Sequence, residues 1–274
     1  MSVSSAGFAF VKGHGTRNDF IVLPDLDGSV HGDLDAAVVA ALCDRRGGIG
    51  ADGVLRVIRT RPESAWFMDY RNADGSVAQM CGNGLRVFVR YLAEAGLIEA
   101  AGVLPVDTRD GIKHATFCDD GEISVDMGVP VLGSGVAVMV DGREYPARAV
   151  DMGNPHAVVL VESLDEAGDL RVSPEFSATD FPSGVNIEFV ARPSSSRLAM
   201  RVFERGVGET ASCGTGACAV AAVGAAADSE RAGVATAAYT VEVAGGELTV
   251  RSDSDHHVHL KGPAVLVAEG TWSG

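Results

Sequence analysis

The chain lacks both an excess of basic charge and any long apolar run. Among its 274 residues, 22 are lysine or arginine and 37 are aspartate or glutamate, which gives a formal net charge of -15. A charge of this sign repels nucleic acids and anionic membranes, and no stretch approaches the roughly 20 apolar residues of a membrane span. The N-terminus has neither the charged nor the apolar region of a secretion signal. We therefore expect a cytoplasmic protein with no nucleic-acid or membrane partner.

Lysine is scarce, which bears on the cofactor chemistry. Lys12, Lys113 and Lys261 are the only lysines, and none lies in the sequence context of a Schiff base or a phosphate-binding loop. The glycine-rich stretch GGIGADG (residues 47–53) follows a helix-like segment and precedes a strand, the reverse of the order in dinucleotide-binding folds. These patterns argue against pyridoxal phosphate enzymes, nucleotide hydrolases and dinucleotide binding, and we expect no cofactor.

Three histidines near the C-terminus, His256, His257 and His259, are spaced like a metal cluster. The polar strand that carries them offers no carboxylate or cysteine partner at a spacing typical of metal sites. We expect these histidines to be exposed and the chain to bind no metal ion.

The five cysteines are an odd number in a chain that is not expected to be exported, which indicates reduced thiols. Cys43, Cys118 and Cys218 belong to no motif, and we interpret them as packing residues. Cys81 and Cys213 differ, because each begins a turn of cysteine, glycine, a small polar residue and glycine that leads into an apolar run. The occurrence of one such turn in each half of the chain indicates that both thiols serve one event.

The two halves of the chain also share the pattern around these turns. The run VLRVIRT, the turn RPES and the run AWFMDYRN predict a β-hairpin, and VNIEFVA, the turn RPSS and RLAMRVFER repeat it in the second half. Asn18 and Asn154 each precede a strand that is followed by a helical segment. The halves are therefore interpreted as diverged copies.

Each cysteine turn is followed by a segment that is apolar nearly all round, residues 85–97 and 217–227. A helix without a polar face is enclosed, and most of the remaining chain has strand patterns. We predict an α+β fold of two pseudo-symmetric domains, each a curved, mixed, barrel-like β-sheet wrapped around a central buried helix. The expected domains are residues 1–118, to which a C-terminal strand at 264–274 returns, and residues 119–263.

The two cysteine turns predict an anion site beside each thiol. The glycines around Asn83 and Thr215 allow a tight turn in which unpaired backbone N–H groups converge at a helix start. Such a position binds anions and stabilises a thiolate, so we expect a lowered thiol pKa and a carboxylate ligand. If the halves pack about a pseudo-twofold axis, one thiolate can remove the proton α to a carboxylate while the other thiol delivers a proton to the opposite face.

Five motifs extend over nearly the whole chain: KGHGTRNDF, RNADGSVAQMCGNGLR, MGNPH, VNIEF and ERGVGETASCGTGACA. Together they closely resemble the diaminopimelate epimerases, cofactor-independent isomerases of lysine and cell-wall precursor biosynthesis. The resemblance implies two pseudo-symmetric halves with one catalytic cysteine each, conversion of LL-diaminopimelate to the meso form, and a homodimer.

The resemblance also implies a role for each matched residue. It makes Cys81 and Cys213 the catalytic acid/base pair. The residues implied at the reacting carboxylate are Asn18, Gly82, Asn83, Gly214 and Thr215. His156 and Glu204 match positions beside the reacting α-amino group, where they would bind it or support acid/base chemistry. The residues implied at the distal amino-acid end are Asn72, Asn154, Asn186 and Arg205.

The chain departs from the family pattern at a few positions. Gly53 stands where many members have a glutamine near the substrate, which leaves one substrate contact unassigned. Leu85 and Val87 replace smaller or thiol residues in the first predicted helix. His14 is open to two interpretations, a loop histidine or a support for the site.

Two other functions remain open from the residues alone. One is a racemase or epimerase of another amino acid on the same fold, acting on proline, hydroxyproline or histidine. The other is a non-catalytic protein that binds a dicarboxylic amino acid through its two helix starts.

Overall fold

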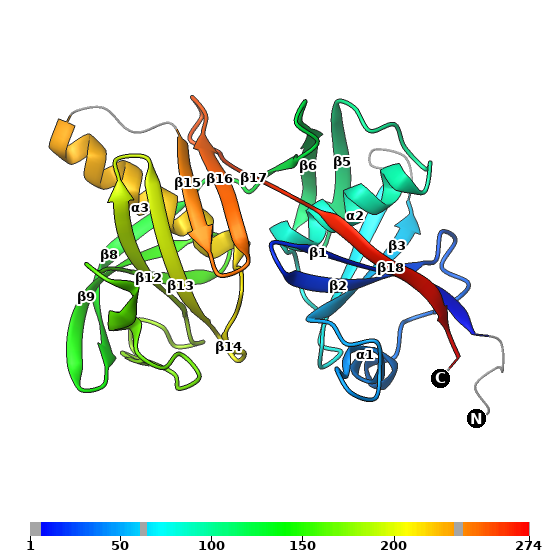
Figure 1. Ribbon diagram of the computed structural model, residues 1–274, viewed down its shortest axis with the longest axis horizontal. Helices are drawn as coiled ribbons and strands as arrows, with labels where there is room; N and C mark the ends of the chain where they lie inside the picture. Colours follow the sequence, from blue (N-terminus) through cyan, green and yellow to red (C-terminus); the bar gives the residue numbers. More distant parts are fainter. Residues whose placement is uncertain (1–6, 61–64, 233–237, 274) are drawn as a thin grey trace. The chain divides into compact units, whose positions relative to one another are not determined.

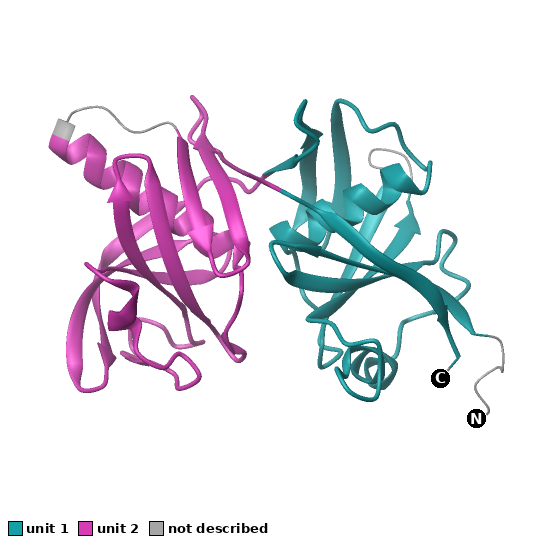
Figure 2. Cartoon of the chain, viewed as in Figure 1, with its two compact units in different colours: residues 1–125, 263–274 teal, residues 126–262 magenta. Residues whose placement is uncertain are grey.

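The computed structural model describes residues 7–60, 65–232 and 238–273. It divides the chain into two compact units, which Figure 2 shows in different colours. Unit 1 comprises residues 1–125 and 263–274, and unit 2 comprises residues 126–262. The first division thus lies after residue 125, where the sequence pattern predicted one after residue 118, and the second lies within one residue of the predicted position. No helix of the described residues is long and apolar enough to cross a membrane.

Unit 1 contains a mixed sheet in which neighbouring strands pair in the order β18, β1, β2, β3, β4, β5, β6, β7. These strands are β1 (Phe8–Gly15), β2 (Asn18–Pro24), β3 (Gly53–Arg59), β4 (Trp66–Asn72), β5 (Val103–Thr108), β6 (Gly111–Phe117), β7 (Ile123–Asp126) and β18 (Val265–Trp272). The C-terminal strand β18 therefore belongs to the sheet of the N-terminal half, where it pairs antiparallel with β1.

Unit 2 repeats this plan with the pairing order β8, β9, β10, β12, β13, β15, β16, β17. These strands are β8 (Val131–Val140), β9 (Arg143–Asp151), β10 (Pro155–Leu160), β12 (Asn186–Ser194), β13 (Arg197–Glu204), β15 (Ala238–Val243), β16 (Gly246–Ser252) and β17 (Val258–Gly262). Two short strands, β11 (Glu175–Phe176) and β14 (Gly208–Glu209), pair with β8 and β13.

The two sheets have their parallel pairs at matching places, so the two halves repeat one strand topology. β2 with β3 and β4 with β5 are parallel in unit 1, and β10 with β12 and β13 with β15 are parallel in unit 2. The other neighbouring pairs in the two series are antiparallel. The predicted α+β fold of curved mixed sheets is confirmed, and in the described part of the chain neither sheet closes into a barrel.

Each sheet wraps around one buried helix, as the apolar segments predicted (Figure 1). Helix α2 (Gly82–Glu94) contacts β1, β2, β3, β4, β6 and β18, and helix α3 (Gly214–Ala232) contacts β9, β10, β12, β13, β15, β16 and β17. Leu85, Phe88 and Leu92 of α2 have no exposed surface. Apolar side chains of α2 are therefore buried within unit 1. Two further helices, α1 (Ala36–Cys43) and the 3-10 helix η1 (Leu164–Ala167), contact β3 and β12–β13 respectively. Separate apolar clusters lie between α1 and strands β2 and β3, and around Ala167 of η1.

Both predicted hairpins are present, but one turn lies later than predicted. The turn RPES of the first hairpin lies outside the described residues. In the second hairpin, Arg192, Pro193 and Ser194 continue β12, and the register shifts between Ala191 and Ser194 before β13 begins at Arg197. A proline is tolerated at such an irregularity because its missing N–H is not required by the ladder.

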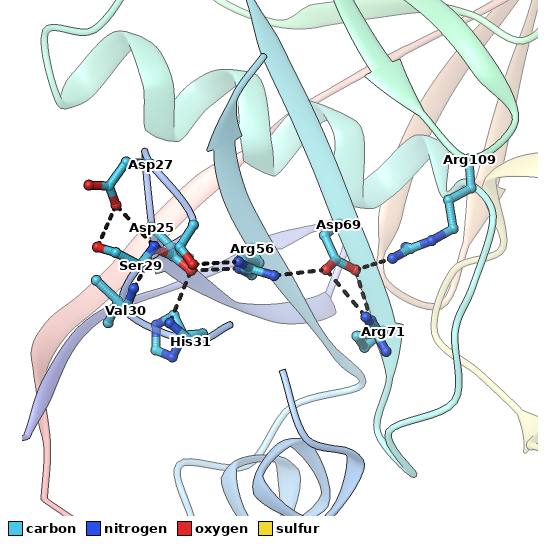
Figure 3. A network of polar contacts seen from close by, with 10 residues as sticks. Asp25, Asp27, Ser29, Val30, His31, Arg56, Asp69, Arg71 and Arg109 are labelled. Atoms are coloured by element: carbon cyan, nitrogen blue, oxygen red, sulfur yellow. Dashed lines mark hydrogen bonds and ion pairs between the residues drawn. The ribbon is translucent and has the colours of Figure 1, made fainter. Parts of the chain in front are cut away.

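A network of buried charges crosses β3 and β4 in unit 1 (Figure 3). Arg56 of β3 lies directly opposite Asp69 of β4, and its Nε donates to Asp25 Oδ2 at 2.7 Å. Asp69 Oδ1 accepts from Arg71 Nε at 2.8 Å and from Arg109 Nη2 at 2.7 Å. Burial by itself would raise the pKa of Asp69, but the bonds from Arg71 and Arg109 outweigh it and lower that pKa. The carboxylate is therefore ionised well below neutral pH.

We expect Asp69→Asn to lower the free energy of unfolding by about 3 kcal/mol at pH 7, because it removes the charge that buried Arg56 faces across the ladder. The matched control is Asp110→Asn, which removes a half-exposed carboxylate paired with Lys113 and should cost no more than about 1 kcal/mol. Urea unfolding measures both. Because the folded-state pKa of Asp69 is depressed, its contribution is present above the usual aspartate range and is lost as the pH falls below about 4. The difference between the wild type and Asp69→Asn should therefore shrink in acid, and an undiminished difference at pH 3 would contradict this explanation.

Candidate active site

Cys81 and Cys213 occupy equivalent positions at the starts of the two buried helices. Cys81 is the N-cap of α2, with an extended backbone, and its Sγ accepts from Gly84 N at 3.4 Å. Cys213 Sγ accepts from Gly216 N at 3.4 Å. Both sulfurs therefore take the hydrogen bond that a serine or aspartate oxygen takes at most helix starts.

Glycine is needed where α3 passes over β12. A Cβ atom at Gly216 would lie 2.7 Å from Glu188 Oε1 and 3.3 Å from Cys213 Sγ. A side chain there would displace the thiol or the carboxylate, so the second glycine of the CGTG turn keeps both groups in place.

Asn18 is the first residue of β2, and it joins the two polar groups at the start of α2. Its Oδ1 accepts from Asn83 Nδ2 at 3.2 Å and from Cys81 Sγ at 3.7 Å. Asn83 has 1% of its surface exposed, and Gly82 is also buried. The structure thus brings together the residues of unit 1 that the resemblance implies at the reacting carboxylate.

A longer polar chain leads from Cys213 into the interior of unit 2. Cys213 Sγ lies 3.5 Å from Thr215 Oγ1, which accepts from Asn154 Nδ2 at 3.3 Å. Asn154 Oδ1 lies 3.0 Å from His156 Nε2. The other ring nitrogen, Nδ1, lies 2.7 Å from Glu188 Oε1.

Glu188 is a site residue that the sequence analysis missed. Its side chain and that of His156 have no exposed surface, and its Oε2 has no hydrogen-bond partner among the described residues. A buried carboxylate is costly unless it is paired. The available signal was a charged residue in the middle of the apolar strand VNIEFVA, since a strand enclosed on both faces excludes glutamate unless a partner lies beside it.

Strand register shows which residues of unit 1 occupy the positions of His156 and Glu188, and these residues differ in kind. In the parallel pairs, Phe20 lies opposite Gly53 and His156 lies opposite Asn186, so the asparagines at 18 and 154 precede equivalent positions. Phe20 and Leu55 of unit 1 thereby correspond to His156 and Glu188 of unit 2. The side chains at these positions are therefore apolar in the unit of Cys81, whereas in the unit of Cys213 they are an imidazole and a carboxylate.

The prediction of a lowered thiol pKa is wrong for Cys213. Its pKa is raised well above the usual value, first by burial and then by the charges of Glu204 and Glu188. The bonds from Thr215 and from Gly216 N act in the opposite direction but do not offset these effects. Cys213 is therefore a protonated thiol in the free protein at neutral pH, because a buried anion between two carboxylates is unfavourable.

The residues implied at the distal amino-acid end fall into separate groups. Asn186 is buried, and its Oδ1 accepts from Arg205 N at 3.0 Å while its Nδ2 donates to Pro155 O at 3.2 Å. Arg205 is exposed, and its Nη1 donates to Ser183 O at 2.9 Å. Asn72 belongs to unit 1, where its Nδ2 donates to Ser76 Oγ at 2.9 Å. Asn154 belongs to the polar chain of Cys213 instead.

Glu204 ends β13 next to Arg205, and its Oε1 accepts from Thr210 Oγ1 at 2.5 Å. This bond orients the carboxylate whose charge raises the pKa of Cys213. The structure therefore brings Glu204, His156 and Cys213 into one electrostatic neighbourhood.

Close packing explains the departure from the family pattern at Gly53. A Cβ atom at Gly53 would lie 2.6 Å from Arg71 O and 2.8 Å from Tyr70 Cε2, so this backbone leaves no room for a glutamine. Leu85 and Val87 have no exposed surface. His14 Nδ1 accepts from Arg17 N at 3.4 Å, so it braces the turn that leads from β1 into Asn18.

The remaining cysteines and histidines have structural contacts. All five cysteines are free thiols; Cys43 and Cys218 are buried, and burial raises the pKa of Cys43 to about 12. Contrary to the sequence interpretation, two of the C-terminal histidines have carboxylate partners: His257 Nδ1 lies 2.9 Å from Asp126 Oδ1, and His259 Nε2 lies 2.9 Å from Asp253 Oδ2. No group of three or more potential metal ligands occurs among the described residues.

Solved structures of low sequence identity share the fold. A phenazine biosynthesis protein of the PhzF family from Bacillus anthracis has a TM-score of 0.71 at 18% identity, with 97% of this chain and 99% of that chain covered. A hydroxyproline epimerase from Agrobacterium vitis has a TM-score of 0.68 at 15% identity, with 99% and 93% covered. These likenesses concern the two-unit fold.

Sequence relatives are far closer. The diaminopimelate epimerase of Streptomyces coelicolor is 51% identical over 97% of this chain and 96% of its own length. That of Thermobifida fusca is 51% identical over 95% and 96%. The pattern that defines the diaminopimelate epimerase family matches residues 10–133 and 148–267. With the two cysteine-capped helices in place, this chain belongs to the diaminopimelate epimerase family.

Proposed function

We propose that the chain converts LL-diaminopimelate to meso-diaminopimelate by moving protons between the substrate α-carbon and two cysteine thiols, without a cofactor. The observation that carries this proposal is the matched pair of cysteine-capped buried helices, each surrounded by the residues that the family resemblance assigns to the substrate. The 51% identity to relatives named diaminopimelate epimerase supports the choice of substrate. A role in lysine and cell-wall precursor biosynthesis follows from the same resemblance.

The proposed reaction balances if the two sulfurs hold one proton between them before and after each turnover. A thiolate at one cysteine takes the α-hydrogen as a proton, which leaves the electron pair on the α-carbon next to the carboxylate. Backbone N–H groups at the helix starts and the amide of Asn83 stabilise the negative charge that spreads into that carboxylate. The thiol of the other cysteine delivers its proton to the opposite face of the carbon and becomes the thiolate. The product is the epimer, and the two cysteines have exchanged protonation states.

The charges around Cys213 suggest how substrate binding activates that thiol. Glu204 and Glu188 raise its pKa in the free protein. The resemblance places the α-ammonium group of the substrate beside Glu204 and His156. A positive charge there offsets the carboxylates, so the pKa of Cys213 falls when the substrate binds. The thiol becomes reactive only when the substrate is bound.

We assign the distal carboxylate and amino group of the substrate to Asn72, Asn154, Asn186 and Arg205. Arginine fits this role because a planar guanidinium binds a carboxylate with two parallel hydrogen bonds, and the exposed group of Arg205 is available for it. Gly214 and Thr215, at the start of α3, are assigned with Gly82, Asn83 and Asn18 to the reacting carboxylate.

The same resemblance suggests a homodimer in the cytoplasm. The proposed chemistry requires both thiols to stay reduced, which the cytosol maintains. In the described sheet of unit 1, β18 is an edge strand with half-exposed Val265 and Val267, and an apolar edge of this kind is suited to contact with a second copy.

The two alternative functions have less support. Epimerases of proline-type substrates share the fold at 15–16% identity, but such substrates have no second carboxylate for Arg205 to bind. A non-catalytic binding protein would have no need of cysteine rather than serine at both helix starts.

The purified chain should convert LL-diaminopimelate to the meso form under reducing conditions without added cofactor. We expect Cys81→Ala and Cys213→Ala each to lower kcat by about a thousandfold or more, because each removes one acid/base group. Cys118→Ala, which removes a partly buried thiol outside either cluster, is the matched control and should retain activity. Chiral chromatography of the product measures the conversion; no meso form from the wild type would refute the proposal.

In heavy water, the delivering thiol carries deuterium before the substrate arrives. We expect the product of the first few per cent of turnover to contain deuterium at the α-carbon, while unreacted substrate keeps its original hydrogen, in both directions. Mass analysis of the separated epimers makes the measurement. Product that retains the original α-hydrogen would mean that one base acts on both faces.

Glu204→Gln should lower the pKa of Cys213 in the free protein, because it removes a negative charge that raises it. The expected readout is faster alkylation of Cys213 by iodoacetamide at pH 8, followed by peptide mass spectrometry, with a rate profile displaced to lower pH. Glu209→Gln, which removes a nearby surface carboxylate bonded to Arg201, should leave the profile in place. An unchanged profile in Glu204→Gln would remove Glu204 from the environment of the thiol.

A further inference from the structure

Two asparagine amides in unit 1 form a chain with a charged group at each end. Arg86 Nη2 donates to Asn83 Oδ1 at 3.0 Å, and Asn83 Nδ2 donates to Asn18 Oδ1 at 3.2 Å. Asn18 Nδ2 then donates to Asp52 Oδ2 at 2.8 Å. Arg86 has no exposed surface. The chain links the interior of α2 to the segment that precedes β3.

The charged ends fix the direction of every bond in this chain. A guanidinium only donates hydrogen bonds, and an ionised carboxylate only accepts them. Asn83 must therefore present its oxygen to Arg86 and its nitrogen to Asn18. Asn18 must present its nitrogen to Asp52, which leaves its oxygen on the side of Asn83 and Cys81. The Sγ of Cys81 consequently faces an acceptor, 3.7 Å away.

Asp52 is held in place by its own contacts. Its Oδ1 accepts from Arg45 Nη2 at 2.7 Å, and its Oδ2 also accepts from Asp19 N at 3.2 Å. Arg45 also donates two hydrogen bonds to Asp19. Burial would raise the pKa of Asp19, but Arg45 and Lys12 lower it to about 2. The cluster is thus a fixed arrangement of ionised groups from β1, β2 and the segment before β3.

The equivalent asparagine of unit 2 presents its other end toward its cysteine. Asn154 directs Nδ2 to Thr215 Oγ1, beside Cys213, and Oδ1 to His156. The bond directions around the two thiols therefore differ, although the backbone positions are equivalent. In unit 1 the direction is set from both ends, by Arg86 through Asn83 and by Asp52, and the sequence analysis assigned no role to Asp52.

We propose that Asp52 is a positioning residue for Cys81: by fixing the amide of Asn18, it keeps an acceptor oxygen against the thiol and so keeps the S–H proton on Cys81 in the substrate-free protein. Without Asp52, the Asn18 amide is held from one side only, by the bond from Asn83 Nδ2. It then rotates more readily, and in the rotated state it donates an N–H to the sulfur, which favours the thiolate. The role in catalysis rests on the proposed function, since it requires Cys81 to be an acid/base group. The effect on the thiol is independent of turnover.

The charged and titratable groups in the network around Cys81 are few enough to test separately. They are Arg86 on α2, Lys12 and His14 on β1, Asp19 on β2, and Arg45 and Asp52 between α1 and β3. Asp52 is the one among them that bonds directly to Asn18. It is also 43% exposed, so its replacement is compatible with folding.

The test is the rate at which iodoacetamide alkylates Cys81 in the full chain without substrate, measured from pH 6 to 10 by peptide mass spectrometry. We expect Asp52→Asn and Asp52→Ser to raise the rate at pH 7 by about three- to tenfold and to displace the profile to lower pH. Asp44→Asn is the matched control, because it removes a carboxylate of the same segment that bonds only to the backbone of Arg46 and Gly47. Unchanged alkylation in both Asp52 variants would overturn the proposal.

A double-mutant cycle separates amide orientation from the loss of a nearby charge. In Asn18→Ala, Asp52 has no amide to orient, so adding Asp52→Asn should change the alkylation profile no further. An equal shift in the presence and absence of Asn18 would mean that the charge acts through space, and would refute the positioning role. Failure of the wild type to epimerise diaminopimelate would refute the proposed function and leave these alkylation results unaffected.

Discussion

A sulfur atom that caps a buried helix is the constraint on which both clusters depend. The first N–H groups of an α-helix have no partner within the helix, and at the start of α2 the residues Gly82, Asn83 and Gly84 are all buried. Cys81 and Cys213 accept the bonds of Gly84 N and Gly216 N. The same atoms that satisfy these helix starts are the proposed acid/base groups. Any change at these sulfurs therefore affects both local stability and chemistry, and the two effects have to be measured separately.

The two thiols have equivalent backbone positions but different chemical environments. Beneath Cys81, Phe20 and Leu55 are apolar, and the polar contact comes from the side, through Asn18. Next to Cys213, the imidazole of His156 and the carboxylate of Glu188 are both buried. An enzyme that converts one stereoisomer into another has no need of identical bases, because the substrate presents a different arrangement of groups to each face. The different residues at these two positions are consistent with a different acid/base environment for each thiol.

The sequence predicted those features that depend on local pattern. Apolar runs identified the enclosed helices, although α2 does have a polar row, Arg86, Arg90 and Glu94, of which Arg86 is buried. Alternation identified the hairpins of β3–β4 and β12–β13. The cysteine turns led directly to both helix starts. Glu188 and Asp52 were missed because their partners, His156 and Asn18, are brought beside them only by the parallel pairs β10–β12 and β2–β3. The direction of the Cys213 pKa was wrong for a related reason, since burial and Glu204 outweigh a favourable position at the helix start.

The position of β18 has a consequence for the order in which the chain can fold during synthesis. Unit 2 is continuous in sequence, from residue 126 to residue 262, whereas unit 1 requires β18 beside β1. The ribosome therefore releases every strand of the second unit before it releases the last strand of the first. The N-terminal unit, although made first, keeps one edge of β1 unpaired until β18 has been synthesised. An unpaired strand edge of this kind is open to pairing with other chains while synthesis continues.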